Sequence, residues 1–224
     1  MISPSIDPLS DKNKELSQDI IDSVLNKYGL NKDKPIIAQI SRFDYLKDPI
    51  GVIQVFEMVR KSMDCQLVLA GGTAKDDPES EKVLEEVKNR ASDNPDIHIL
   101  LIPPNSDIDI NALQRAATII LQKSIKEGFG LTVTEALWKG KPVVASAVGG
   151  IQLQVKNNFT GLLCHSIDGA AYAIKRLLSN PDYASWLGRN AREHVRQNFL
   201  ITRHLKDYLL LFISLCYHSE VIYL

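Results

Sequence analysis

Hydrophobic residues in this chain fall into two recurring patterns, short continuous runs and stripes spaced three or four positions apart. Short runs are typical of strands buried on both faces, whereas spaced stripes indicate amphipathic helices. The runs predict strands over residues 36–40, 66–70, 96–102, 118–122, 142–146 and 161–164. Because helical stretches separate these strands, we expect an α/β fold: a three-layer αβα domain with a mostly parallel sheet of about six strands.

The helices are predicted from their apolar stripes and from their start and stop residues. They comprise residues 16–28, a helix that begins at Pro49, a helix opened by Asp76-Asp77-Pro78-Glu79, and residues 110–117, 131–139, 168–179, 182–197 and 203–215. Their placement between the strands predicts helices on both faces of the sheet.

The two ends of the chain differ from its middle. Residues 3–10 are rich in proline and serine, and proline removes a backbone donor, so we predict an extended connector there. The apolar run over residues 209–217 is too short to span a bilayer and is interpreted as the buried face of a terminal helix. We therefore divide the chain into a connector (1–12), an α/β domain (13–200) and a C-terminal helix and tail (201–224).

Composition and charge narrow the functional classes. Hydrophobic residues make up 45% of the 224 residues, enough for a core, and the net charge of -1 argues against a general nucleic-acid surface. The three cysteines form no CxxC motif, and residues 1–10 show no signal peptide. We therefore expect a reduced, cytoplasmic protein with neither nucleic acid nor membrane as a partner. The histidines show no metal-binding spacing, and we predict no metal site.

Residues 126–135 (KEGFGLTVTE) carry the strongest chemical signal in the chain. Glu127 and Glu135 bracket a glycine turn that follows the strand at 118–122 and opens a helix. Open α/β sheets bind ligands at the carboxyl ends of their strands, and amides at a helix N-terminus favour an anion such as phosphate. The carboxylates suit sugar and ribose hydroxyls, an assignment we favour over a general acid/base pair. The alternatives are capping by Glu127 and compensation of the helix dipole by Glu135.

Two cations follow the first strand, at the same edge of the predicted sheet. Arg42 and Lys47 lie on the first strand-to-helix loop, where they would hold a diphosphate and neutralise its charge as it departs. Solvated loop cations are the alternative. The loop has no glycine, so the G-x-G-x-x-G motif is absent, which counts against a nicotinamide or flavin enzyme.

Two further features admit two interpretations each. The pairs Gly71-Gly72 and Gly149-Gly150 end strands, either to make room for a ligand or only as tight turns. Asp107 and Asp109 form a D-x-D pattern, which resembles the motif that holds a metal on a sugar nucleotide. They stand just before a predicted helix, however, and we favour Asp109 as its N-cap.

Together these motifs resemble the retaining glycosyltransferases of the GT-B fold, family four. The resemblance rests on E-x₇-E after a strand, R-x₄-K after the first strand and a G-G-I turn. Residues 111–124, 127–130 and 136–144 are also similar to a narrower branch, the trehalose glycosyltransferring synthases and the trehalose phosphorylases. The chain departs from the family pattern at two places. Gln152-Leu153 stands where proline and glutamate are usual, and Asp48 stands where glycine is common.

The resemblance implies a Rossmann-like domain, one half of a GT-B fold, with residues 1–12 as the remnant of an interdomain linker. It implies catalytic roles for Arg42, Lys47 and Glu127. The two cations would bind the donor diphosphate and stabilise the leaving group without a metal, and Glu127 would contact the donor hexose. Glu135 would hold the ribose hydroxyls. The other implied donor-binding residues are Ile102, beside the base, and the backbone amides of Gly128, Phe129, Gly130, Leu131 and Thr132.

The function implied by the resemblance is the donor-binding half of a retaining hexosyltransferase. It would transfer glucose from ADP-glucose or UDP-glucose to glucose, forming trehalose, with no cofactor. The N-terminal acceptor domain would be missing, so this chain alone is expected to be inactive, and an unpartnered apolar face on the terminal helix would allow a homodimer. The alternatives are a trehalose phosphorylase domain that uses glucose 1-phosphate, a non-catalytic nucleotide-binding module and, more weakly, a dehydrogenase.

Overall fold

The computed structural model describes residues 2–72, 78–92 and 94–216. It contains one parallel sheet, and the predicted α/β fold is confirmed. The strand order is β3-β2-β1-β4-β5-β6. The strands are β1 (Ile36–Ile40), β2 (Gln66–Gly71), β3 (Ile97–Leu101), β4 (Ile119–Gln122), β5 (Val143–Ser146) and β6 (Leu162–Cys164).

Helices cover both faces of the sheet because the central strands are apolar on both faces. One core cluster joins α1, α4, α5 and α8 to the sheet, and the other joins α2, α3 and α7. The helices are α1 (Gln18–Lys27), α2 (Pro49–Arg60), α3 (Pro78–Ala91), α4 (Asp107–Ala116), α5 (Leu131–Trp138), α6 (Ile151–Gln154), α7 (Ile167–Leu178), α8 (Pro181–Asn198) and α9 (Ile201–Cys216). Asp76 and Asp77, expected to open the third helix, lie outside the described residues.

The strand order reverses between β1 and β4, which lie side by side although two strands separate them in sequence. In open α/β sheets, the loops that follow two such strands run to opposite faces, and ligands bind in the crevice between them at the carboxyl edge. The predicted site residues follow β1 and β4, so the topology brings them to this crevice.

The start of α4 differs from the expectation. The helix begins at Asp107, after Ser106 at its N-cap, and Asp109 lies inside the first turn. The prediction of Asp109 as N-cap is therefore wrong. Its carboxylate instead accepts hydrogen bonds from Lys27 Nζ and Tyr28 Oη, each at 2.6 Å, which joins α4 to the end of α1.

The N-terminal connector is tied to the junction of α8 and α9. Ile6 pairs with Leu200 in a parallel bridge, with hydrogen bonds from the Ile6 amide to Phe199 O (2.9 Å) and from the Ile201 amide to Ile6 O (3.0 Å). Arg203 Nη2 also donates to Ser3 O at 2.8 Å. The connector is thus fixed at Ile6, but it is extended only up to Asp7, because residues 8–10 form a turn.

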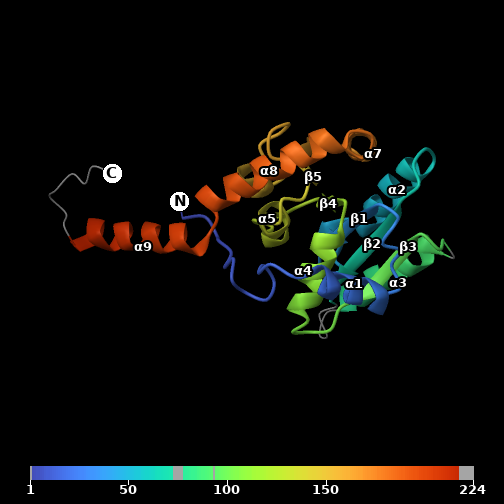
Figure 1. The fold of residues 1–224 in the computed structure, drawn as a ribbon, viewed down its shortest axis with the longest axis horizontal. Coiled ribbons are helices and arrows are strands. Elements are labelled where there is room, and N and C mark those ends of the chain that lie inside the picture. The colour runs from blue at the N-terminus through green and yellow to red at the C-terminus, as the bar shows by residue number, and fades with distance from the viewer. Residues whose placement is uncertain (1, 73–77, 93, 217–224) are drawn as a thin grey trace.

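The terminal helix α9 extends away from the body of the domain (Figure 1), and none of its residues is buried within its described length. The interpretation of residues 209–217 as a buried face is therefore wrong as far as Cys216, where the description ends. The unpartnered apolar face expected from the resemblance is present instead. Across the described residues, no helix is long and apolar enough to cross a membrane.

Candidate functional site

Lys47 and Glu127 meet at the point where the strand order reverses. Lys47 ends the 3₁₀ turn η1 (Tyr45–Lys47) after β1, and Glu127 lies in the loop after β4. Lys47 Nζ lies 2.6 Å from Glu127 Oε2, and 19% of the lysine and 10% of the glutamate side chain are exposed. Ser124 Oγ donates to the same carboxylate oxygen at 3.3 Å. The expected lysine and first carboxylate are therefore neighbours, held in place before any ligand arrives.

Local hydrogen bonds explain why the chain presents Lys47 at this position. Asp44 accepts from the Leu46 amide and caps η1, while Gln39 Nε2 donates to Lys47 O at 2.7 Å. Asp48 adopts a left-handed φ of 51°, a conformation that glycine enters freely and that aspartate tolerates. Its side chain also caps α2. The aspartate that replaces the common glycine therefore keeps the turn and adds a helix cap.

Arg42 lies directly after β1, but its guanidinium points largely into solvent. Its side chain is 63% exposed, and its distance to Asp44 Oδ2 is 3.6 Å, a weak ion pair. Among the described contacts, none joins Arg42 to Lys47 or Glu127. The structure therefore assembles Lys47 with Glu127 and leaves Arg42 at the same edge as a loosely held cation.

The two glycine pairs serve backbone packing. A Cβ atom at Gly71 would lie 1.8 Å from Ser41 O, so the end of β2 approaches the loop that carries Arg42 too closely for any side chain. Gly149 has a φ of +48°, and a Cβ there would lie 1.8 Å from Glu127 O. The Gly150 amide donates to Gly128 O at 3.0 Å. The loop after β5 thus packs against the backbone of the glycine turn.

Gln154 is a residue that the sequence analysis missed. It is fully buried in α6, its Nε2 donates to Phe129 O, and its Oε1 accepts from Thr134 Oγ1 at 2.6 Å. The amide therefore joins the turn to the helix that follows it. A single glutamine without a motif has no sequence signal of its own, so only the structure reveals this role.

The turn ends at Gly130, which has a φ of +85° and directly precedes the first residue of α5. In the described structure no side chain caps this helix, and the first backbone bond inside it runs from the Val133 amide to Gly130 O at 2.9 Å. The amides of Leu131 and Thr132 point out of the helix end, where an anion would be favoured.

Glu135 lies one turn further along α5 and is 5% exposed. Its Oε2 accepts from Gln114 Nε2 of α4 at 3.1 Å. Burial raises the pKa of this carboxyl, while the hydrogen bond from Gln114 and the charge of Lys139 oppose that shift. Burial likewise lowers the pKa of the Lys139 ammonium to about 7. No described contact links Glu135 to Glu127, so the two carboxylates stand in separate environments.

A hollow of about 440 Å³ lies at the carboxyl end of β3. Ile102 forms part of its wall, and its amide donates to Gly71 O at 2.9 Å. The hollow is lined by Gly72, Leu101, Ile102, Pro103, Pro104, Asn105, Ser106, Asp107 and Ile110. It offers a largely apolar space beside the edge where Ile102 was expected.

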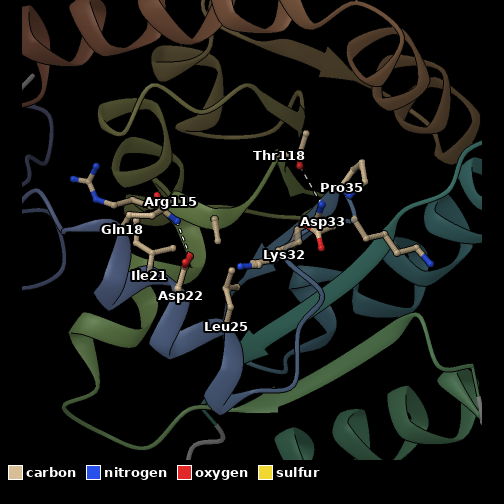
Figure 2. A pocket seen from close by; sticks show the side chains of 12 residues that line it. Gln18, Ile21, Asp22, Leu25, Lys32, Asp33, Pro35, Arg115 and Thr118 are labelled. Carbon is tan, nitrogen blue, oxygen red and sulfur yellow. Dashed lines mark hydrogen bonds between the residues drawn. The ribbon is translucent and has the colours of Figure 1, made fainter.

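A larger hollow of about 610 Å³ lies at the opposite edge of the sheet, between α1, α4 and the loop before β1 (Figure 2). Its lining includes Pro35 and Thr118, which precede β1 and β4. Figure 2 shows the Arg115 guanidinium pointing away from this hollow, toward the N-terminal segment. Because it faces the amino ends of the strands, this hollow is separate from the crevice that holds Lys47 and Glu127.

The D-x-D pattern is occupied by ion pairs. Asp109 binds Lys27, and Asp107 Oδ1 lies 3.3 Å from Lys12 Nζ. Among the described residues, no group of three or more His, Cys, Asp or Glu side chains is placed to hold a metal ion.

The family described as "Glycosyl transferases group 1" matches residues 21–194. The chain is 46% identical over 217 residues to "Trehalose synthase" of Rubrobacter xylanophilus, covering 96% of this chain and 52% of that protein. It is 36% identical over 174 residues to "Trehalose phosphorylase" of Grifola frondosa, covering 71% of this chain and 24% of that protein.

Among solved structures, sucrose-phosphate synthase from Thermosynechococcus elongatus superposes with a TM-score of 0.78 at 26% identity. The match covers 97% of this chain and 53% of that one. The expected resemblance is confirmed. The chain spans about half the length of the curated trehalose synthases it matches.

Proposed function

Because the chain belongs to the group 1 glycosyl transferases, we propose that it is the donor-binding half of a retaining hexosyltransferase that forms trehalose. The donor would be a nucleoside diphosphate-glucose and the acceptor glucose. The observation that carries this proposal is the ion pair between Lys47 and Glu127 at the strand-order reversal, next to the N-terminal end of α5. The similarity to a trehalose synthase supports the choice of sugar.

Each group at the crevice has a chemical task in this proposal. The Lys47 ammonium and the exposed Arg42 guanidinium stabilise negative charge on the departing diphosphate, so no metal is required. Glu127 accepts hydrogen bonds from hexose hydroxyls. The amides of residues 128–132 bind phosphate oxygens at the helix end. Glu135 accepts from the ribose, and the hollow beside Ile102 receives the base.

Lys47 and Glu127 neutralise each other in the free protein, which has a consequence for donor binding. A diphosphate that enters the crevice competes for the ammonium, while the sugar hydroxyls replace the ammonium as donors to the carboxylate. Each of the two side chains then gains a partner on the donor in place of the one that it loses. Both halves of the donor are needed for that exchange, which favours the intact nucleotide sugar over either fragment.

Titration calorimetry of the purified chain tests the proposal. We expect ADP-glucose or UDP-glucose to bind more tightly than the matching nucleoside diphosphate, and inorganic phosphate to bind weakly. Glu127→Gln should remove the preference for the sugar, a loss of about 10-fold or more in affinity. Lys47→Met should weaken both the nucleotide sugar and the free diphosphate. A chain that binds neither nucleotide would overturn the assignment.

A trehalose phosphorylase is the second candidate, supported by the similarity to the Grifola frondosa enzyme. That function needs one phosphate and no ribose contact. It predicts that phosphate and glucose 1-phosphate bind, that nucleotides do not, and that Glu135→Gln has no effect on binding. A non-catalytic nucleotide module would instead bind nucleotides without regard to the sugar and would tolerate Glu127→Ala.

We further propose that the acceptor site lies on another domain, because the chain spans 52% of the Rubrobacter xylanophilus protein. Catalysis in a cleft that must close and exclude water needs both walls. The chain alone should therefore form little or no trehalose from glucose and the donor. Disaccharide synthesis by the purified chain at ordinary enzyme rates would contradict this.

A further inference from the structure

The segment over residues 11–14 has an unusual set of backbone partners. Two of its amides are satisfied locally, since the amides of Asn13 and Lys14 both donate to Ser10 O at 2.8 Å. Its residues lie in a turn, so their carbonyl groups belong to no helix or strand. Carbonyls in irregular segments are normally satisfied by water or by side-chain donors.

Three side chains supply donors to these carbonyls. Asn111 Nδ2 donates to Asp11 O and to Lys14 O, both at 2.8 Å. Arg115 Nη2 donates to Lys14 O at 2.9 Å and to Asn13 O at 3.3 Å. Lys139 Nζ donates to Lys12 O at 2.8 Å. All four consecutive carbonyls of residues 11–14 are therefore held by side chains of α4 and of the residue that follows α5.

Two of the three donors, Asn111 and Lys139, are buried, and their burial is costly. Asn111 is fully buried, and 8% of Lys139 is exposed, with its ammonium also 3.1 Å from Asn13 Oδ1. Around the ammonium, the neighbouring charges come from each packed element: Glu135 on α5, Arg115 on α4, and Lys12 and Glu15 on the N-terminal segment. Burying an ammonium costs free energy unless hydrogen bonds replace its lost hydration. Here the segment supplies the acceptors for those bonds.

The same two helices also position Glu135. Gln114 lies on α4 between Asn111 and Arg115, and its Nε2 donates to Glu135 Oε2 at 3.1 Å. Lys139 lies one turn after Glu135 on α5, and its Nζ lies 3.4 Å from Glu135 O. The elements that bind the segment therefore also hold Glu135, its carboxylate through Gln114 and its backbone oxygen through Lys139.

We propose that Asn111, Arg115 and Lys139 are positioning residues that form a clasp on residues 11–14, and that the clasp couples the position of this segment to the Glu135 carboxylate. The coupling to donor binding rests on the proposed function of Glu135. The clasp itself does not. Because coupling between two sites is reciprocal, donor binding should protect the segment, and loss of the clasp should weaken the donor.

Hydrogen exchange of the whole chain tests the clasp. In Lys139→Met, which keeps the length of the side chain, the amides of Asn13 and Lys14 should exchange about tenfold faster. Thermal stability should change little, because removal of a buried ammonium offsets the loss of its hydrogen bonds. A merely structural role would lower stability instead.

Lys141→Met is the matched control. This lysine is partly buried two residues further on, and in the described structure it makes no hydrogen bond to residues 11–14. Exchange at the segment should stay as in the unaltered chain. Asn111→Ala provides a second variant, with the same faster exchange expected. Unchanged protection in both Lys139→Met and Asn111→Ala would overturn the clasp.

Donor titrations test the coupling. With ADP-glucose and UDP-glucose as probes, the Lys139→Met affinity should fall about three- to tenfold, while Lys141→Met binds as the unaltered chain. Equal affinities of the unaltered chain and Lys139→Met would overturn the coupling. If the unaltered chain binds neither donor, the proposed function fails, and hydrogen exchange still decides whether the clasp exists.

Discussion

Helices α5 and α9 are both rich in apolar residues, yet they differ in every contact they make. The eight residues of α5 include five that are buried, and it carries Glu135 between the sheet and α8. The sixteen residues of α9 include none that is buried, although Leu205, Leu209 and Phe212 repeat along one stripe. An apolar stripe thus establishes that a helix has a hydrophobic face. What covers that face depends on the rest of the assembly.

Matched leucine substitutions give the largest expected contrast between the two helices. Leu137→Ala in α5 removes a fully buried side chain, which should lower the free energy of unfolding by about 2–5 kcal/mol. Leu209→Ala in α9 removes a half-exposed one and should change it by less than about 0.5 kcal/mol. Urea denaturation followed by circular dichroism measures both. Similar losses would show that α9 is packed in solution.

The turn that leads into α5 should be the next most sensitive place. Gly149→Ala forces a Cβ against Glu127 O and strains a positive φ, so we expect a loss of about 2–3 kcal/mol and weaker donor binding. Gly29→Ala is the control, because it has a φ of +65° but nothing within 4 Å, and strain alone should cost about 1 kcal/mol. Equal losses of unfolding free energy in the two variants would mean that the backbone at Glu127 moves to admit the added Cβ without cost.

The end of α5 should make stability depend on pH. Burial lowers the pKa of Lys139 to about 7 from 10.5, so between these values the unfolded chain binds more protons than the folded one. The free energy of unfolding should therefore rise with pH above about 7, by at least about 1 kcal/mol by pH 9. Lys139→Met should reduce that rise and leave the part due to Lys141, whose pKa burial lowers to about 8. Parallel profiles for the two proteins would contradict the burial of a titrating ammonium.

Charges placed on α9 should have the smallest effect on folding and a clear effect on association. Leu205→Lys together with Phe212→Lys changes two exposed residues, so the unfolding free energy should move by less than about 0.5 kcal/mol. If the apolar face of α9 drives self-association, sedimentation velocity should show a dimer for the unaltered chain and a monomer for the variant. A monomeric unaltered chain would remove the proposed homodimer.

The sheet and the central ion pair were predictable because both depend on local patterns. The runs IIAQI and IILQ are buried at every position and apolar except for one glutamine each, and each ends at the carboxyl edge of the sheet. Lys47 and Glu127 follow those two strands, and the strand-order reversal makes the strands neighbours. Knowing that each residue follows one of these strands was therefore enough to predict that both lie at the same edge of the sheet.

The remaining features depend on contacts between distant parts of the chain. Lys139 bonds to Lys12 across 127 positions, and Asn111 bonds to Asp11 across 100. Single polar residues have no period that would predict such pairs. The N-cap of α4 was misplaced for a related reason, because the Asp109 carboxylate is drawn to Lys27 of a different helix.

The bridge between Ile6 and Leu200 brings the outgoing ends of the domain to one location. Any body joined through both the segment before Ile6 and the helix after Leu200 would be attached by two parallel tethers whose anchor points almost coincide. Such an attachment restricts twisting more than a single flexible tether does, while it leaves rotation about the shared anchor free. The relative motion of the two bodies would then be mainly a rotation about this shared anchor.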